Sequence, residues 1–392
     1  MKNVIGHPAR GTDFYPRERV VKKILRSLGA DNHLQLAAPR RVGKTSILMH
    51  LLDTKQTSDH FFVYVDVEAT TSENNFYKKL YESVIKSEAL TKTGKMFKQI
   101  KDGGNTFLKR IKAISLIDGS IELNSGVDLD FYNELKLLLK GLNFGDKRLV
   151  LLIDEFPYAI NNLIEDESNE KALNLLKSKR ELRQDPVLLT KVQFVYTGSI
   201  SLNTTVENIS ASELVNDIDS ITVSPLIDKE AKELINKLIE TDSLVIGDDE
   251  LDYILQKVVW LIPFHIQLLV KELFDISDEQ NINVVTREII DKAFLEIVDF
   301  RNNNYFEHYL SRLKKLYKGN QYNYAIEILH LASKNDSIIR SQVFNLASKH
   351  EVEDESRRII HNLIYDGYLF QSDTNDYSFN SPILKMWWKK YV

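Results

Sequence analysis

The stretch "LQLAAPRRVGKTSI", residues 34–47, decides the fold because it contains nearly all of a phosphate-binding loop. The pattern of such loops is G-x-x-x-x-G-K-[ST]. Its second glycine, its lysine and its hydroxyl residue are found at Gly43, Lys44 and Thr45. The position of the first glycine is occupied by Ala38. A working loop is therefore expected only if the backbone at that position suits an alanine.

The proline that follows Ala38 explains why an alanine can occupy the position of the first glycine. Pro39 restricts the residue before it to extended backbone angles with a negative φ, and alanine adopts these angles without strain. Alanine can therefore replace glycine, provided that no phosphate has to approach its Cβ atom. We predict a working loop whose nucleotide-binding residues are Ala38, Pro39, Arg40, Arg41, Val42, Gly43, Lys44, Thr45 and Ser46.

The sequence around the loop has the alternation of an α/β fold. An apolar run precedes the loop, and a segment with helical spacing follows it, which is the setting that a phosphate-binding loop requires. Further apolar or β-branched runs cover residues 61–69, 148–155, 191–199 and 220–226, with helix-like stretches between them. Strands that alternate with helices predict a parallel sheet with helices on both faces.

A second motif supports the loop. The apolar run "LVLLIDE" ends in Asp154 and Glu155. A carboxylate at the end of such a strand can hold the Mg²⁺ shell, and its neighbour can polarise an attacking water. The hydroxyl of Thr45 is the second magnesium-binding group that the pattern contains. A GK[ST] tripeptide alone is weak, but the two motifs in this order predict a site for a nucleotide and Mg²⁺.

The composition is that of an ordinary soluble globular protein, with 43% hydrophobic and 27% charged residues, and 392 residues suggest two or three domains. The formal net charge of -5 argues against a protein that coats nucleic acid by bulk charge. The absence of cysteine excludes disulfides, thiolate catalysis and cysteine-ligated zinc. No uncharged apolar run approaches the length of a membrane span, so we expect a cytoplasmic protein without a membrane partner.

The rest of the chain divides into segments with different patterns. Residues 92–126 are the most basic part and contain a hairpin pattern around an Asp-Gly pair, which predicts an insertion with a solvated face or, alternatively, an effector or polyanion contact. Residues 227–300 have helical spacing, and residues 301–320 read as a connecting helix or linker. Residues 321–392 show three helices and then two short strands, which predicts a winged helix-turn-helix.

Together, "APRRVGKTS", "LLIDEFP", "VYTGS", a proline in the next helical region and the winged-helix pattern resemble the archaeal-type P-loop ATPases, a branch of the STAND class within the AAA+ superfamily. The likeness covers nearly the whole chain. It implies a core over residues 1–226 with strand order 5-1-4-3-2, a helical lid over residues 227–300 and a winged helix over residues 321–392. It also implies a nucleotide-controlled switch.

The resemblance assigns roles to the residues of the two motifs. Lys44 would contact the β and γ phosphates of ATP, and Thr45 would bind Mg²⁺. Asp154 would hold Mg²⁺ through water, and Glu155 would be the general base. ATP and Mg²⁺ are therefore the ligands that the resemblance implies.

Further roles follow from the flanking segments. Thr197 or Ser199, at the end of the next strand, would read the γ-phosphate, although turn formation is the usual role of such residues. Arg17, in "FYPRE", would lie near the base and ribose, and a simple helix start is the alternative. In the lid, Pro263 would occupy the sensing position beside the nucleotide, but "WLIPFHIQ" lacks the glycine that usually precedes it. The arginine that completes a neighbouring site is unassigned. Arg180 and Arg183 are candidates, but charges on a solvated helix explain both equally well.

Three functions are compatible with this sequence. The leading one is an ATP-hydrolysing switch, slow and partner-stimulated, that engages a protein partner or another copy of itself. The alternatives are a nucleotide-regulated winged-helix DNA-binding protein, similar to origin-recognition proteins, and a catalytically weak ATP-binding scaffold. DNA is not the favoured partner, because the expected recognition helix begins "EVEDESRR", with four carboxylates before two arginines. We expect the winged helix to face a protein or to lock domains together.

Overall fold

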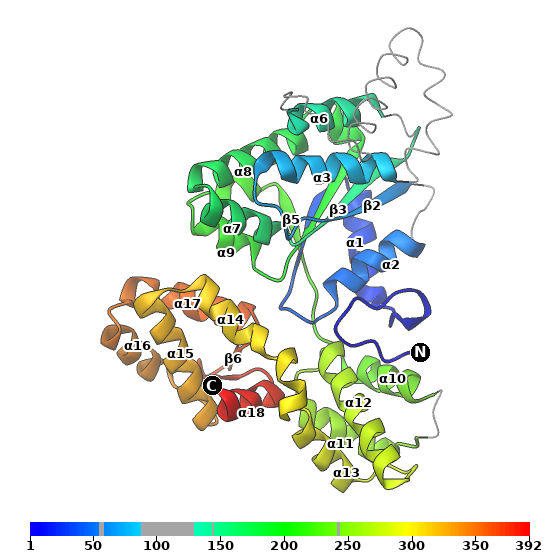
Figure 1. Ribbon diagram of the computed structural model, residues 1–392, viewed down its shortest axis with the longest axis vertical. Coiled ribbons are helices and arrows are strands. Elements are labelled where there is room, and N and C mark those ends of the chain that lie inside the picture. The colour runs from blue at the N-terminus through cyan, green and yellow to red at the C-terminus, as the bar shows by residue number, and fades with distance from the viewer. Residues whose placement is uncertain (55–58, 88–128, 143–144, 241–243) are drawn as a thin grey trace, which may run out of the picture.

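The computed structural model describes residues 1–54, 59–87, 129–142, 145–240 and 244–392, so the insertion predicted at residues 92–126 lies outside the described residues. Figure 1 shows an elongated molecule with an α/β part at one end and a helical part at the other. The two parts follow one another in the chain, since the colours run from blue and green in the first to yellow and red in the second.

A five-stranded parallel sheet forms the core of the α/β part. Its strands are β1 (His33–Ala37), β2 (His60–Asp66), β3 (Arg148–Asp154), β4 (Val192–Thr197) and β5 (Ile218–Thr222). The order in the sheet is β2-β3-β4-β1-β5, which confirms the predicted order 5-1-4-3-2.

The last strand begins and ends earlier than its apolar run suggested. β5 lies at the edge of the sheet and pairs only with β1 among the described strands. Asp219 and Ser220 are exposed there, so the first residues of the strand are partly polar. Hydrophobicity alone therefore placed the strand at residues 220–226, too late in the chain.

Helices cover both faces of the sheet, because alternate residues of each strand point to opposite sides. On one face Leu34, Leu36, Val150 and Leu152 pack in the same core as α1 (Glu18–Gly29) and α2 (Lys44–Thr54). On the other face Leu149, Leu151 and Ile153 pack with four helices. These are α3 (Glu73–Lys86), α6 (Phe131–Gly141), α7 (Phe156–Asp166) and α8 (Asn169–Gln184). Figure 1 shows the two groups on opposite sides of the strands.

Short helical elements complete the α/β part, and a helical region follows it. The short elements are η1 (Gly11–Asp13), η3 (Leu188–Thr190), α9 (Leu202–Glu207) and η4 (Ser212–Val215). The region predicted as a helical lid contains α10 (Asp228–Ile239), α11 (Asp248–Val258), α12 (Pro263–Gln280) and α13 (Arg287–Glu296). The expected connecting helix or linker is η5 (Phe300–Tyr305) followed by α14 (Glu307–Leu316).

The last segment has the order of elements that the winged-helix prediction requires. It consists of α15 (Gly319–Lys334), α16 (Arg340–Lys349), α17 (Glu353–Tyr365), the antiparallel pair β6 (Leu369–Gln371) and β7 (Tyr377–Phe379), and α18 (Pro382–Tyr391). Trp387 and Trp388 of α18 are fully buried and close the core of this segment. The division of the chain into domains stays a prediction.

The C-terminal segment packs directly on the α/β part. Thr204 of α9 donates a buried 2.8 Å hydrogen bond to the side chain of Asn362 on α17. Arg358, one turn earlier on α17, donates to Asn208 at 2.6 Å. The helix that would face DNA in a winged helix therefore contacts the core through part of its surface.

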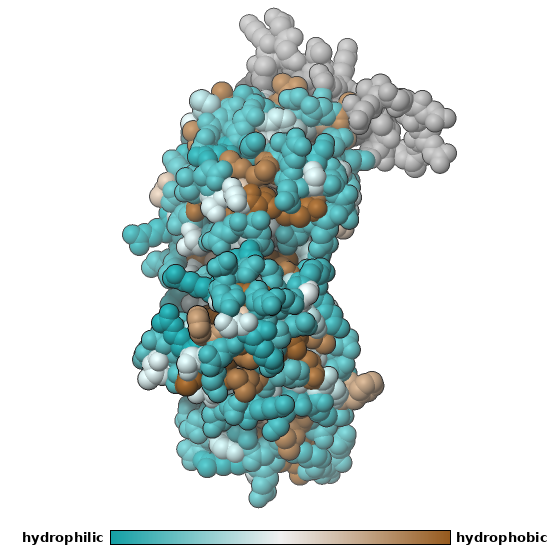
Figure 2. All heavy atoms as spheres, turned by 90° about the vertical axis from the view of Figure 1, so that its left-hand side faces the viewer, coloured by the Kyte–Doolittle hydropathy of each residue, from teal (hydrophilic) through white to brown (hydrophobic). Residues whose placement is uncertain are grey.

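The surface view in Figure 2 is mainly hydrophilic, with apolar residues in separate groups over both parts of the molecule. Within the described ranges, no helix combines the length and the apolar character needed to cross a membrane.

Candidate functional site

The loop between β1 and α2 has the backbone that its sequence predicts. Gly43 has a φ of 95°, in the left-handed region that glycine adopts without strain. Ala38 is not among the residues with positive φ, and its side chain is buried. Alanine therefore suits this position, as the proline argument predicted.

Lys44 is buried at the beginning of α2. Its Nζ donates 2.8 Å hydrogen bonds to the carbonyl oxygens of Ala38 and Pro39. Burial lowers the pKa of this lysine to about 8, while the carboxylate of Glu155 acts in the opposite direction. An anion in the loop would raise this pKa again, because it favours the charged form.

Asp154, at the end of β3, joins the two motifs. Its Oδ2 accepts a 2.8 Å hydrogen bond from the hydroxyl of Thr45 and a 3.2 Å bond from Tyr64. Its Oδ1 accepts a hydrogen bond from the hydroxyl of Thr197. Oxygen atoms from the loop and from β3 thus lie side by side at one edge of the sheet.

This pair of oxygens fits a magnesium ion. Hydroxyl and carboxylate oxygens are hard ligands, and Mg²⁺ is commonly held by one or two carboxylates together with water and phosphate oxygens. Among the described residues no group of three or more His, Asp or Glu side chains forms a metal cage. Thr45 and Asp154 therefore fit an ion that brings most of its ligands with it.

Glu155 follows Asp154 in a left-handed conformation, with a φ of 58°. Its Oε2 accepts hydrogen bonds from the backbone amide of Ser199 at 2.8 Å and from the hydroxyl of Ser199 at 3.0 Å. Burial raises the pKa of Glu155, while the Ser199 amide and the Lys44 ammonium lower it. The carboxylate is thus fixed in direction and lies within the electrostatic reach of the loop.

Thr197 and Ser199 donate hydrogen bonds to the carboxylates of Asp154 and Glu155. Thr197 binds Asp154, and Ser199 binds Glu155 and also lines the pocket beside the loop. A side chain at Gly198, between them, would place its Cβ atom 2.5 Å from Cδ of Pro157, so only glycine permits this approach. The segment "TGS" is therefore built to hold the end of β3.

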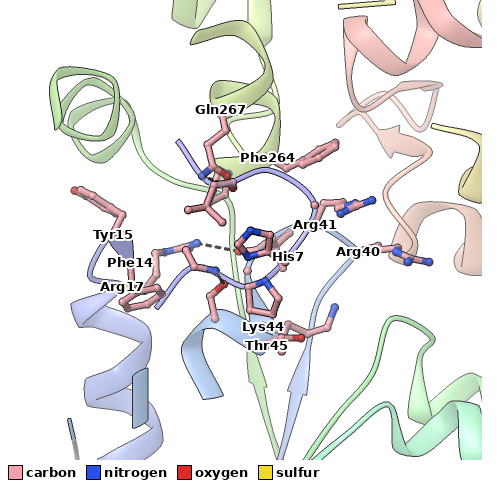
Figure 3. A pocket seen from close by; sticks show the side chains of 18 of the residues that line it. His7, Phe14, Tyr15, Arg17, Arg40, Arg41, Lys44, Thr45, Phe264 and Gln267 are labelled. Carbon is pink, nitrogen blue, oxygen red and sulfur yellow. Dashed lines mark hydrogen bonds between the residues drawn. The ribbon is translucent and has the colours of Figure 1, made fainter. Parts of the chain in front are cut away.

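A pocket in front of the loop is lined by the loop, the N-terminal segment and the start of α12 (Figure 3). Gln267 of α12 donates a 2.9 Å hydrogen bond to the carbonyl of Val4, and the Ala9 amide donates to the hydroxyl of Ser46 at 3.1 Å. His7 lies in the middle of the view, between the loop and Gln267. The N-terminal segment thus bridges the loop and the predicted lid.

Comparisons with known proteins identify the fold. No model of a known protein family matches the sequence, and no curated protein matches it. A Walker-type ATPase of Pyrococcus abyssi superimposes with a TM-score of 0.66 at 16% identity, over 99% of this chain and 100% of that chain. The ORC2 protein of Aeropyrum pernix, in its ADPNP–ADP complexes, has a TM-score of 0.55 at 12% identity, over 97% and 95% of the two chains.

This chain has the P-loop ATPase fold. At these identities the likeness establishes the architecture alone. The roles of individual residues have to be argued from the contacts of this chain.

Arg17 lies immediately before the first residue of α1, and its role near the base and ribose stays a prediction. Its guanidinium donates to the carbonyl of Val42 at 3.2 Å and to the carbonyl of Ser224. The side chain is buried, although it also lines the pocket. Arg17 therefore braces the loop against the segment after β5. Pro263, the first residue of α12, lines the same pocket from the lid side.

The two candidate arginines on α8 are occupied within the chain. Arg183 is buried, forms a 2.8 Å ion pair with Asp217 and donates to the hydroxyl of Tyr196. The alternative of a charge on a solvated helix is wrong for this residue, because its guanidinium is itself buried. Arg180 donates to the carbonyl of Glu213.

Several residues of the site carried no signal in the sequence. Tyr64 occupies an inward position of an ordinary strand, and its bond to Asp154 follows from the pairing of β2 with β3. The N-terminal segment has no motif, and only its contacts with Ser46 and Gln267 place it over the loop. The single available signal was the spacing of Tyr64 two residues before the end of β2.

Proposed function

We propose that this chain is an ATP-binding and ATP-hydrolysing switch with Mg²⁺ as its cofactor. The observation that carries the proposal is the hydrogen bond between Thr45 and Asp154, because it brings the magnesium-binding groups of both motifs to one point. The buried ammonium of Lys44 and the oriented carboxylate of Glu155 lie at the same edge of the sheet.

Lys44 binds the β and γ phosphates in this proposal. Its ammonium now donates only to neutral carbonyl oxygens, and a phosphate oxygen is a stronger acceptor because it is charged. The first backbone amides of α2 and the amides of the loop provide further donors, as at other helix N-termini that bind anions.

Thr45 and Asp154 would hold Mg²⁺, which when bound neutralises charge on the phosphates and acts as a Lewis acid. Glu155 acts as the general base toward the attacking water. Its Oε2 is held by Ser199, which leaves Oε1 to accept the proton. Thr197 keeps Asp154 oriented through its other carboxylate oxygen.

The contacts of the C-terminal segment support a switch. α9 begins three residues after Ser199, and it carries the hydrogen bond from Thr204 to Asn362 of α17. Lys315 of α14 lies 4.6 Å from the centre of the Tyr158 ring, on the helix that follows Glu155. If hydrolysis moves the end of β3 or the end of β4, these contacts would therefore move the C-terminal segment as well.

In this proposal residues 227–300 act as a lid and residues 321–392 as a winged-helix module that engages a protein partner, or another copy of the chain, in one nucleotide state. We propose a cytoplasmic location. The DNA-binding alternative has less support, because the first turn of α17 contains Glu353, Asp354 and Glu355. Its next turn is bound to the core through Arg358.

Two measurements test this function. Purified full-length protein should bind ATP saturably and hydrolyse it only with Mg²⁺, and binding without turnover would instead establish the scaffold alternative. A titration with random duplex DNA at several salt concentrations should show no micromolar binding near physiological salt. Tight binding with a steep salt dependence would establish the DNA-binding alternative.

A further inference from the structure

A second group of cationic and hydrogen-bonding side chains lies where the loop meets α14. It consists of Arg40 and Arg41 from the loop and His308, Tyr309 and Arg312 from α14, and we call it the loop–α14 cluster. The two arginines also line the pocket described above, but the three residues of α14 do not.

The chain that follows α17 lies between the two sides of the cluster. A Cβ atom added at Gly367 would lie 3.1 Å from Cβ of Pro39, so the chain after α17 touches the loop beside Arg40. The preceding residue, Asp366, accepts a buried 2.5 Å hydrogen bond from Arg312. Arg312 is thus fixed close to the loop.

Aromatic rings connect the other side of the cluster. The guanidinium of Arg41 lies 4.5 Å from the centre of the Phe264 ring, and that ring is 5.9 Å from the ring of Tyr305. Tyr305 lies one helical turn before His308, whose ring is 4.2 Å from the ring of Tyr309. Arg41, His308 and Tyr309 therefore lie in one continuous group.

Several polar atoms of this cluster are buried without a partner. Within the described part of the chain, no hydrogen bond reaches Nε of Arg41, Nε of Arg312, the hydroxyl of Tyr309 or either ring nitrogen of His308. Buried polar groups are nearly always paired, so this many unpaired atoms in one place indicate a missing acceptor.

The charges of the cluster point to the same kind of ligand. The positive charges in reach of this cluster are the guanidinium groups of Arg40, Arg41 and Arg312 and the ammonium of Lys44. The carboxylates of Asp366 and Glu155 act on Arg312 in the opposite direction, so positive charge remains in excess. Burial, and after it the three guanidinium charges, lower the pKa of His308 to about 2, so its imidazole is neutral. A neutral imidazole, a phenol and guanidinium groups are donors suited to an anion with several oxygens.

We propose that the loop–α14 cluster binds a phosphate-type oxyanion beside the nucleotide pocket, at a site that shares Arg40 and Arg41 with it but also uses the residues of α14. Guanidinium groups match the geometry of such ions because they donate two parallel hydrogen bonds. In Figure 3 the side chains of Arg40 and Arg41 extend away from His7 and toward the C-terminal segment. The bound ion joins the loop to α14 and neutralises the excess positive charge between them.

The test measures the binding of inorganic phosphate, and of sulfate as a second probe, to nucleotide-free full-length protein by calorimetry. Lys44→Ala removes the ammonium of the nucleotide pocket, and this variant should bind phosphate within about threefold of the unaltered protein. Tyr309→Phe and His308→Phe remove unpaired donors, and each should weaken phosphate binding by about tenfold or more. Arg26→Met, which removes an exposed guanidinium on α1, is the matched control and should bind phosphate normally.

The thermal stability of the variants shows whether they fold. Tyr309→Phe should unfold at a temperature no lower than the unaltered protein in phosphate-free buffer, because the hydroxyl that it removes has no partner. If Lys44→Ala abolishes phosphate binding while Tyr309→Phe retains it, the ion occupies the nucleotide pocket and the proposal is wrong. It is equally wrong if free phosphate does not bind and Tyr309→Phe weakens ATP binding but leaves ADP binding unchanged. That result would assign the cluster to the terminal phosphate of the nucleotide.

Discussion

Two lysines of the α/β part are buried, and they differ in their surroundings. Lys44 donates to two carbonyl oxygens and lines the pocket, with 7% of its surface exposed. Lys179, on α8, has no exposed surface, and no hydrogen-bond partner for its Nζ exists among the described residues. Its ammonium instead lies 3.8 Å from the centre of the Phe194 ring.

Burial lowers the pKa of both side chains, but their neighbours differ. Near Lys44 the carboxylates of Glu155 and Asp154 raise the pKa again, which remains at about 8. Near Lys179 the charge of Arg183 acts in the same direction as burial, and the pKa falls well below the usual range. A buried lysine with a shifted pKa is therefore not a functional site by itself. Acceptors, carboxylates and access to a pocket distinguish Lys44.

The largest expected effect tests this distinction directly. Lys44→Ala should abolish measurable ATP binding, because the phosphates lose the only lysine that the loop contains. Lys179→Met is the matched control, and it should bind ATP like the unaltered protein because Lys179 does not line the pocket. Isothermal titration of both variants with ATP and Mg²⁺ makes the comparison. Unchanged affinity in Lys44→Ala would contradict the assignment of the loop.

The second effect concerns the chemistry beside Lys44. Glu155→Gln should retain ATP binding and lose hydrolysis by at least about a hundredfold, because the amide keeps the shape and loses the basicity. Steady-state phosphate release measures this loss, and Glu167→Gln, at the other end of α7, is the control with normal turnover. Turnover that persists within a few-fold of normal would mean that another carboxylate is the base.

The third effect concerns stability and Lys179. Lys179→Met should raise the free energy of unfolding by about 1–3 kcal/mol at neutral pH, because it removes a buried donor without a partner. The folded pKa lies below that of the unfolded chain, so the unfolded chain binds more protons and stability rises with pH. Denaturant titrations should therefore show a gap between the two proteins that narrows from about pH 7 to about pH 10. A gap that does not change with pH would mean that folding leaves the pKa of Lys179 unshifted, with the amine protonated in both states.

The smallest effect concerns the serine that holds Glu155. Ser199→Ala removes the 3.0 Å hydrogen bond to the carboxylate and keeps the amide bond. The pKa of Glu155, already raised by burial, should rise further, because that hydrogen bond favours the charged form. Hydrolysis requires the carboxylate, so the acid limb of the pH–rate profile should move to higher pH. Ser199→Thr, which keeps a hydroxyl, should restore the normal profile, and an unshifted limb in Ser199→Ala would show that Oγ has no influence on the base.

The two motifs were sufficient to predict the fold, and they named residues that the structure brings together around the loop. The strand order 5-1-4-3-2 came from the resemblance that the two motifs carry, and the sheet confirms it. The positions of Gly43 and Ala38 in the loop followed from backbone angles that each residue type permits. Asp154 and Thr45 were both expected as magnesium-binding groups of the two motifs, and a 2.8 Å hydrogen bond joins them.

Contacts between distant segments could not be predicted in this way. The position of Arg17 in "FYPRE" gave no sign of the two backbone carbonyls that its guanidinium binds. A solvated face was one of the two interpretations of Arg183, yet its partner Asp217 lies 34 residues later in the chain. A pattern over a few neighbouring residues contains no information about such partners.

The sequence by itself determined the loop, the acidic strand end and the alternation of strands and helices, because these depend on spacing and on the angles that single residues adopt. Only the tertiary structure decided which side chains surround the loop. The N-terminal segment lies over Ser46, Tyr64 reaches Asp154, and α14 brings Arg312 close to Pro39 through Asp366 and Gly367. Each of these contacts joins residues that are far apart in the chain, and packing of whole elements, not local preference, sets their distance.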